Sequence, residues 1–154
     1  MKNRLLPQLL FALVGLIAAP AYAYKVISIA DGDTLTVLVE RRPIKIRLAG
    51  IDAPEKNQAF GSRSQQSLSE LCFNKEADYR KIDEDQYGRI VAMVRCDGVD
   101  ANRAQVERGM AWVYLRFSRD PKMLALQDAA KAARRGLWAD KDPTPPWQFR
   151  QQNR

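Results

Sequence analysis

The sequence predicts a small β-barrel with helices, an α+β domain whose barrel has five strands. Five short segments alternate apolar and polar side chains with the two-residue period of a strand, and turn residues separate them. A segment with helical periodicity follows the third strand, and two more follow the fifth. Five short strands with a helix after the third favour a small closed barrel.

The first 23 residues are predicted to be a secretory signal peptide. Lys2 and Arg4 precede the apolar run Leu9–Ala19, and Ala21-Tyr22-Ala23 places small residues at the −3 and −1 positions of a cleavage site. The apolar run is shorter than the about 20 residues that a permanent membrane-spanning helix needs. We therefore expect an exported protein, periplasmic or secreted, with no stable membrane association after cleavage.

Three strands open the remaining chain, which has the size of one ordinary domain. Lys25–Ala30 and Asp33–Glu40 are predicted to pair across a hairpin turn at Asp31-Gly32. Pro43–Ala49 follows the turn at Arg41-Arg42 and is the third strand.

The later elements are a helix, two strands and two more helices. The predicted segments are Ser62–Phe73, Glu76–Ile82 with Ile90–Cys96, and then Asp100–Arg108 and Pro121–Arg135. This order is typical of the oligonucleotide-binding (OB) type of barrel, here with three α-helices. We expect one domain over residues 24–140 and an extended, Pro-rich tail over residues 141–154.

The composition restricts the chemistry. The chain has no histidine, which removes Ser-His and Cys-His nucleophile systems and every imidazole base. Without the two basic residues of the leader, the formal net charge falls from +7 to +5, which weakly favours anionic partners. Two cysteines in an oxidising compartment favour a disulfide between Cys72 and Cys96.

Charged residues gather where the third strand runs out into a loop. The stretch I-R-L-A-G-I-D-A-P-E-K contains Arg47, Asp52 and Glu55 within nine residues. Ordinary loop chemistry is one interpretation, because strand ends are solvated and Asp and Pro favour turns. Asp33 is harder to explain that way, because its strand parity places it on the same face as Leu35, where an unpaired carboxylate is costly.

A hard cation would resolve that cost, since Ca²⁺ prefers carboxylate oxygens such as those of Asp33 and Asp52. Arg47 and Arg89 are permanent donors suited to a phosphate, and Glu55 is a carboxylate base nearby. Carboxylates, a cation and two arginines without a histidine form a plausible set for phosphodiester hydrolysis.

These motifs resemble the staphylococcal nuclease family. The resemblance rests on D-G-D-T, then R-L-A-G-I-D-A-P-E, then D-Q-Y-G-R, an Asn-containing helix and a late G-L-W, from about Lys25 to Trp138. It implies an OB-fold barrel with three helices and Ca²⁺-dependent hydrolysis of DNA and RNA that leaves 3′-phosphate ends.

The resemblance also implies a role for each matching residue. Calcium ligands would be the carboxylates of Asp33 and Asp52 and the backbone carbonyl of Ala53. Glu55 would be the general base, or would mainly order the attacking water. The phosphate-binding arginines and the aromatic residues beside the nucleotide would be Arg47, Arg89, Tyr87 and Tyr114.

The chain departs from the family pattern in the loop Lys56–Gly61, which is shorter than in the best-known member. The cysteine pair is absent from that member. Ala53 stands where threonine is common, but a carbonyl ligand does not depend on the side chain.

Three hypotheses follow. The first is an exported, monomeric nuclease, the second a non-catalytic OB-fold module that binds nucleic acid, and the third a basic domain that binds anionic surfaces. A complete set of candidate catalytic residues favours the enzyme, and all five are present: Asp33, Arg47, Asp52, Glu55 and Arg89.

Overall fold

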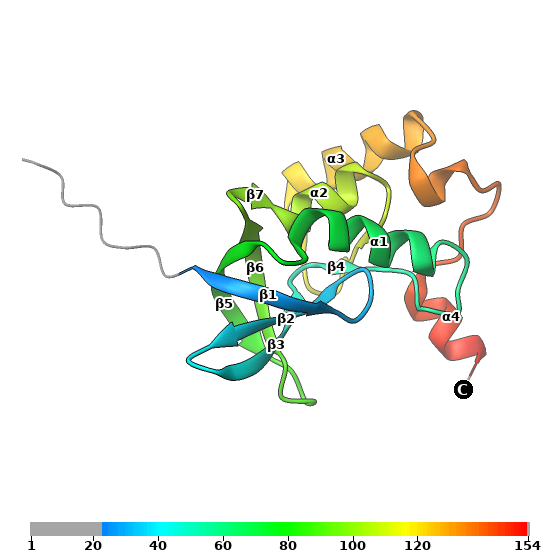
Figure 1. Cartoon of the computed structure of the whole chain (residues 1–154). Helices are drawn as coiled ribbons and strands as arrows, with labels where there is room; N and C mark the ends of the chain where they lie inside the picture. The colour runs from blue at the N-terminus through cyan, green and yellow to red at the C-terminus, as the bar shows by residue number, and fades with distance from the viewer. Residues whose placement is uncertain (1–22, 154) are drawn as a thin grey trace, which may run out of the picture.

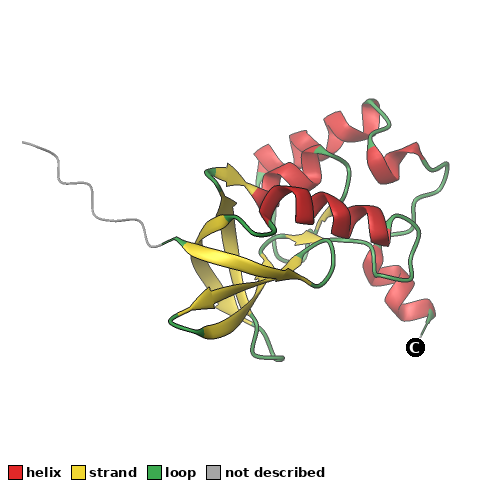
Figure 2. Cartoon of the chain, in the orientation of Figure 1, coloured by secondary structure: helices red, strands yellow, loops and turns green. Residues whose placement is uncertain are grey.

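A computed structural model of the chain describes residues 23–153. A β-barrel forms one side of the molecule, and most of the helices lie on the other (Figures 1 and 2). The predicted signal peptide lies outside the described residues, except for Ala23. Within residues 23–153, no helix combines the length and apolar character needed to cross a membrane.

Five strands close the barrel as predicted. They are β1 (Tyr24–Ile29), β2 (Thr34–Val39), β3 (Arg42–Leu48), β5 (Glu76–Glu84) and β6 (Ile90–Cys96). Consecutive neighbours in the order β3-β2-β1-β5-β6 pair antiparallel, and a parallel pairing of β3 with β6 completes the closure.

Three two-residue strands accompany the barrel. Strand β7 (Val99–Asp100) pairs with β6, whereas β4 (Ile51–Asp52) pairs with β8 (Trp112–Val113) in a separate small sheet. This second sheet anchors the chain immediately after β3, so that the stretch after Gly50 has a fixed course.

The barrel interior follows the alternation of the sequence. Val26, Leu35, Val37, Ile46 and Leu48 are fully buried, since β-branched and aliphatic side chains at every second position of β1, β2 and β3 point inward. The period-2 pattern therefore identifies the core face correctly.

Residues 23–153 contain four α-helices rather than three. They are α1 (Gly61–Cys72), α2 (Ala101–Glu107), α3 (Pro121–Ala132) and α4 (Pro146–Gln152), with a 3₁₀ turn at Gly136–Ala139 between the last two. The prediction of a wholly extended tail is therefore wrong from Pro146 onward. Proline excludes a helix interior, but Pro146 occupies the first turn of α4, where its missing N–H has no intrahelical partner to lose.

Both early turns also differ in detail from the prediction. Gly32 does not supply a left-handed hairpin turn; it lets α1 approach, because an added Cβ would overlap the side chain of Ser64. The second hairpin turns at Glu40 and Arg41, which both have positive φ, one residue earlier than predicted.

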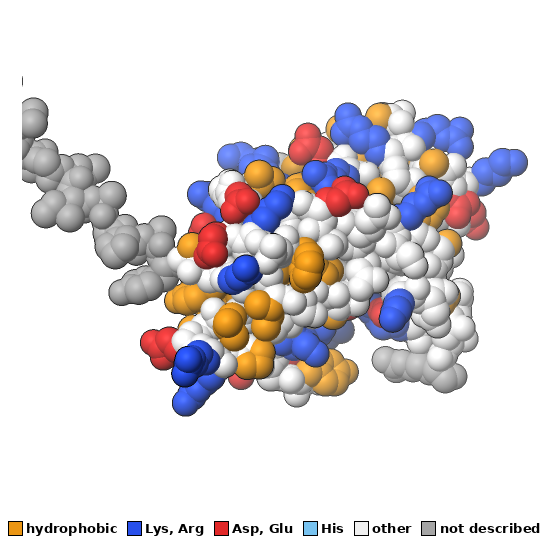
Figure 3. Space-filling view, viewed as in Figure 1, with side chains coloured by type: hydrophobic (Ala, Val, Ile, Leu, Met, Phe, Trp, Pro, Cys, Tyr) orange, Lys and Arg blue, Asp and Glu red, His pale blue; other side chains and the backbone are white. Residues whose placement is uncertain are grey.

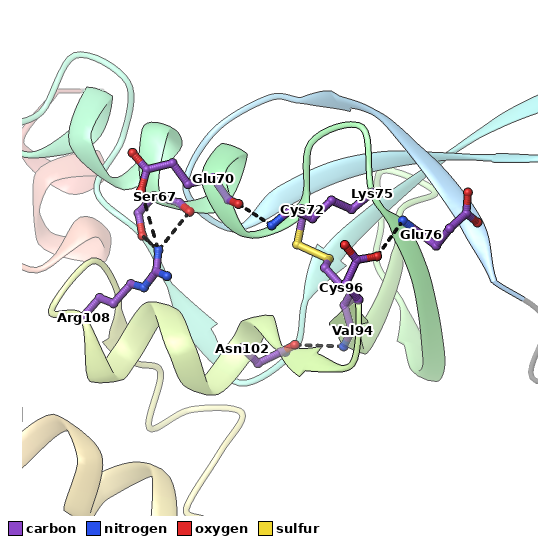
Figure 4. Close-up of a disulfide and its surroundings, with 10 residues drawn as sticks. Ser67, Glu70, Cys72, Lys75, Glu76, Val94, Cys96, Asn102 and Arg108 are labelled. Carbon is purple, nitrogen blue, oxygen red and sulfur yellow. Dashed lines mark hydrogen bonds and ion pairs between the residues drawn. A yellow bond between two sulfur atoms is a disulfide. The ribbon is translucent and has the colours of Figure 1, made fainter.

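The disulfide joins Cys72, at the end of α1, to Cys96, at the end of β6 (Figure 4). Both cysteines are buried in the main hydrophobic core. The cross-link therefore ties the first helix to the last barrel strand, and it closes a loop with a sequence separation of 24.

Removing this cross-link should lower the free energy of unfolding by about 3 kcal/mol, because the open chain has more conformational entropy when unfolded. Urea denaturation of the oxidised protein and of the Cys72→Ser/Cys96→Ser double variant measures the difference. Equal midpoints for the two proteins would contradict a stabilising role for the disulfide.

Candidate active site

Two carboxylates lie buried where the β1–β2 loop meets β4. Asp33 immediately precedes β2 and Asp52 ends β4, and the two residues are only 6% and 1% exposed. The Nη2 atom of Arg47, on β3, is 3.4 Å from Asp33 Oδ2 and 3.1 Å from Asp52 Oδ1. One guanidinium of the barrel thus contacts both buried negative charges.

The stretch after β3 folds around Arg47. Its Nη1 atom donates to the backbone carbonyls of Leu48 and Ile51 at 3.3 and 3.1 Å. Between them Gly50 turns the chain with a φ of 72°, a conformation that glycine adopts without strain. The chain therefore does turn after β3, as ordinary loop residues predict, and this turn places Asp52 next to Arg47.

The side chain of Asn102, on α2, holds the backbone at the end of β3 through hydrogen bonds. Its buried side chain donates to the carbonyls of Ala49 and Ala92 at 2.9 and 3.2 Å and accepts from the N–H of Val94 at 2.9 Å. All these partners are backbone groups, so this residue is structural.

Negative charge accumulates in this buried region. Burial raises the pKa of Asp31 to about 6, and repulsion from Asp33 adds to the shift. Burial also raises the pKa of Asp52, and the charge of Asp33 adds to it, although hydrogen bonds from Arg150 act in the opposite direction. Asp31 also accepts a hydrogen bond from the Asp33 N–H at 3.0 Å.

Arg89 joins the site from the β5–β6 turn. Its Nε donates to Asp85 Oδ2 at 2.6 Å, and its backbone N–H donates to Asp85 Oδ1 at 3.0 Å. Burial alone would raise the pKa of Asp85, but the hydrogen bonds from Arg89 outweigh this effect and lower it.

The Nη1 atom of Arg89 is 3.5 Å from Thr34 Oγ1, which itself donates to Asp33 Oδ1 at 3.0 Å. The Thr34 hydroxyl therefore connects Arg89 to the buried carboxylate of Asp33. These contacts of Asp85 and Thr34 could not be predicted from the sequence, although both residues lie inside the motifs D-Q-Y-G-R and D-G-D-T.

The two tyrosines have different surroundings. Tyr87 is 74% exposed, and the Arg89 guanidinium lies 5.6 Å from its ring centroid. Tyr114, directly after β8, is half-buried and packs face to face against Trp147 of α4. Tyr87 is thus open to a ligand, whereas one face of Tyr114 is already covered.

Glu55 is linked to this centre through a residue that the sequence analysis missed. Arg150 of α4 donates to Glu55 Oε1 at 2.7 Å and to both oxygens of Asp52, at 3.2 Å and 2.8 Å. These contacts raise the pKa of the guanidinium above its usual value, chiefly through the hydrogen bonds to Asp52. A local sign of this contact is the three-residue spacing of Trp147 and Arg150 after Pro146, which places both side chains on one side of a short helix.

The donor set fits a hard divalent cation. Asp33 and Asp52 present buried carboxylates, and the Ala53 N–H donates to Asp33 Oδ2 at 2.9 Å, which brings the Ala53 backbone beside them. Within residues 23–153, no group of three acidic, Cys or His side chains already converges as a metal site. A cation here would therefore be held by two carboxylates together with backbone or external oxygens.

The charges outside the site are dispersed. On the face shown in Figure 3, Lys and Arg side chains are interspersed with Asp and Glu rather than forming one basic track. Apolar side chains gather over the barrel strands, where Ile27 and Leu38 are each 39% exposed. Arg47, Arg89 and Arg150 also pair with carboxylates, and their side chains are less exposed than that of Lys81, which pairs with Glu84 on the surface.

Comparison with known proteins agrees with the fold. The family model of staphylococcal nuclease homologues matches residues 45–140. A Haemophilus influenzae protein named an uncharacterized endonuclease is 41% identical over 147 residues, which cover 95% of this chain and 83% of the relative. A Shigella flexneri protein named micrococcal nuclease is 38% identical over 153 residues, covering 90% of this chain and 88% of the relative. The chain therefore belongs to the staphylococcal nuclease family, a family of phosphodiester hydrolases.

Proposed function

We propose that this protein is an exported, Ca²⁺-dependent nuclease that hydrolyses phosphodiester bonds of both DNA and RNA and leaves 3′-phosphate ends. The observation that carries the proposal is the contact of one guanidinium, Arg47, with two buried carboxylates, Asp33 and Asp52. A buried acidic pair beside fixed cationic donors suits a bound cation and a phosphate. The predicted leader and the disulfide support an oxidising compartment.

The residues of the chain divide the work as follows. Asp33, Asp52 and the Ala53 carbonyl would hold Ca²⁺, which when bound supplies positive charge for the phosphate and acidifies water. Glu55 orients the attacking water and accepts its proton, since no histidine is present to do so.

The two arginines act on the phosphate itself. Arg47 fixes its orientation, and Arg89 stabilises the charge that grows on the phosphate oxygens in the five-coordinate transition state. Asp85 positions Arg89, because it accepts from both the backbone and the side chain of that residue.

The second candidate function is a module that binds nucleic acid without cutting it. Incubation of the purified protein with plasmid DNA and with RNA, in Ca²⁺ or in chelator, distinguishes the two. We expect cleavage of both polymers in Ca²⁺ alone, with 3′-phosphate ends in the mapped products. Binding without cleavage under all conditions would establish the module instead.

Asp33→Asn should weaken Ca²⁺ binding strongly, by about 10- to 100-fold, because the number of carboxylates sets the affinity of such a site. The amide keeps the size of the side chain but removes its charge. Isothermal titration calorimetry with Ca²⁺ measures the effect directly.

Asp128→Asn on α3, an exposed residue of the same type, is the matched control and should bind Ca²⁺ like the unmodified protein. An unchanged affinity in the Asp33 variant would remove Asp33 from the proposed ligand set. We also expect tighter binding when a nucleotide phosphate is present, since it contributes further oxygens.

A further inference from the structure

Helix α4 occupies the charged centre of the site. Arg150 forms a two-point ion pair with Asp52 and a third contact with Glu55, at distances of 2.7–3.2 Å. Asp52 is 1% exposed, so both of its oxygens are enclosed while Arg150 and Arg47 hold them. One side chain of α4 therefore contacts two carboxylates to which the proposed function gives roles in cation binding and proton transfer.

The same helix also covers the aromatic part of the site. The rings of Trp147 and Tyr114 are stacked, with centroids 5.3 Å apart and planes at 4°. Trp147 also meets Trp112 edge to face, at 5.7 Å. Trp147 and Arg150 lie three residues apart, on one side of a helix, so a single turn of α4 covers both the charged and the aromatic groups.

The segment leading to α4 is attached to the loop after β4. The side-chain amide of Gln58 donates to the Thr144 carbonyl at 2.7 Å. Pro54 and Phe149 line a cavity with a volume of about 160 Å³ between this loop and α4. This cavity lies mainly between the loop after β4 and the segment that precedes α4, and α4 borders it through Phe149. The side-chain polar contacts of α4 with the site are those of Arg150 with Asp52 and Glu55.

A bound cation and Arg150 make incompatible demands on Asp52. Ca²⁺ binds carboxylate oxygens at about 2.3–2.6 Å. Arg47 contacts Asp52 Oδ1 and leaves Oδ2 to a cation, but Arg150 Nη2 holds Oδ2 at 2.8 Å. Both cations on one buried carboxylate would stand within about 5 Å of each other and repel, and the 39% exposure of the Arg150 side chain lets water screen only part of this repulsion. The contact of Arg150 with Glu55 Oε1 likewise favours the ionised carboxylate and makes it a weaker acceptor for a proton from water.

We propose that Arg150 is an internal counter-ion that competes with the activating cation for Asp52 and Glu55, and that α4 withdraws from the site when the cation and the substrate phosphate bind. This inference rests on the proposed Ca²⁺ site. Withdrawal of α4 also uncovers Tyr114 for a nucleotide base. In its docked position α4 is therefore autoinhibitory, and binding of the substrate together with the cation displaces it.

The test is the Ca²⁺ dissociation constant of the full chain, measured by calorimetry in Arg150→Gln and Arg150→Lys. We expect Arg150→Gln to bind Ca²⁺ about tenfold more tightly, because the competing state is lost and more of the protein is competent to bind. Arg150→Lys should lie between this variant and the unmodified protein, since lysine keeps the charge but loses the two-point contact. Arg103→Gln, an exposed arginine on α2, removes the same charge elsewhere and should leave the affinity unchanged.

Amide hydrogen exchange gives a second readout that does not depend on activity. In the unmodified protein, saturating Ca²⁺ and a non-cleavable nucleotide should accelerate exchange of the α4 amides, such as those of Gln148 and Phe149, which bond to Pro145. Unchanged or slower exchange there would overturn the inference.

Equal Ca²⁺ affinity in Arg150→Gln and the unmodified protein, with Ca²⁺-dependent cleavage intact, would also overturn this inference while leaving the proposed function standing. Weaker Ca²⁺ binding in Arg150→Gln would do the same and would make Arg150 a supporting residue. If the unmodified protein showed no Ca²⁺-dependent cleavage, both proposals would be overturned.

Discussion

Replacing Glu55 by glutamine is expected to lower the rate of Ca²⁺-supported cleavage by about 10²–10⁴-fold. Glutamine keeps the length of the side chain and its ability to hydrogen-bond, but it cannot accept a proton from water. Folding should be little affected, because Glu55 is half-buried and Arg150 is the single polar partner of its side chain among the described residues. Initial cleavage rates on single-stranded DNA at saturating Ca²⁺ measure the effect.

Glu107→Gln, an exposed residue at the end of α2, is the matched control and should cleave at the unmodified rate. Binding of a nucleotide to Glu55→Gln should persist, which separates a loss of proton transfer from a loss of binding. If Glu55→Gln cut as fast as the unmodified protein, Glu55 would not be the base, although the family assignment would stand.

Replacing Arg89 by alanine should lower kcat by about 10²–10³-fold, with a much smaller change in KM. Asp85 holds the Arg89 guanidinium in place before substrate binds. The guanidinium can therefore stabilise the negative charge that develops in the transition state without changing its position. The expected split between kcat and KM distinguishes Arg89 from a residue that only binds substrate. Steady-state kinetics on a short oligonucleotide provide both constants.

Arg95→Ala on β6 is the control, because it removes an exposed arginine from the strand that follows Arg89. Asp85→Asn tests the positioning role separately: it keeps Arg89 but loses an ion pair, and should lower kcat less than removal of the arginine does. A rise in KM with an unchanged kcat in Arg89→Ala would show that Arg89 binds the ground state and transition state equally.

Most of the barrel could be predicted from the sequence, because its signals are local. Alternation places Val26, Leu35 and Ile46 in the core, and each predicted strand agrees with the structure to within two residues. Asp33 is buried as its parity with Leu35 predicts, although it lies one residue before β2 and Thr34, of the opposite parity, is buried as well.

The turns could be predicted only in part. An Asp-Gly pair is typical of a tight hairpin, but Gly32 is required by the close approach of Ser64 on α1, a contact between distant parts of the chain. The purpose of a glycine therefore depends on which neighbour packs against it, and that neighbour is not visible in the local sequence.

By itself, the sequence determined the closed barrel, the cysteine pair and the order of Asp33, Arg47, Asp52, Glu55 and Arg89 along the chain. Only the tertiary structure decided that α4 exists and where Arg150 lies. A helix of seven residues has little stability alone, and α4 is stabilised by the Trp147–Tyr114 stack and the Arg150–Asp52 ion pair. The partners Arg150 and Glu55 are separated by 95 positions. Sequence periodicity shows which residues share a face of one helix or strand. The contact between Arg150 and Glu55 forms only when the folded barrel places the loop after β4 next to α4.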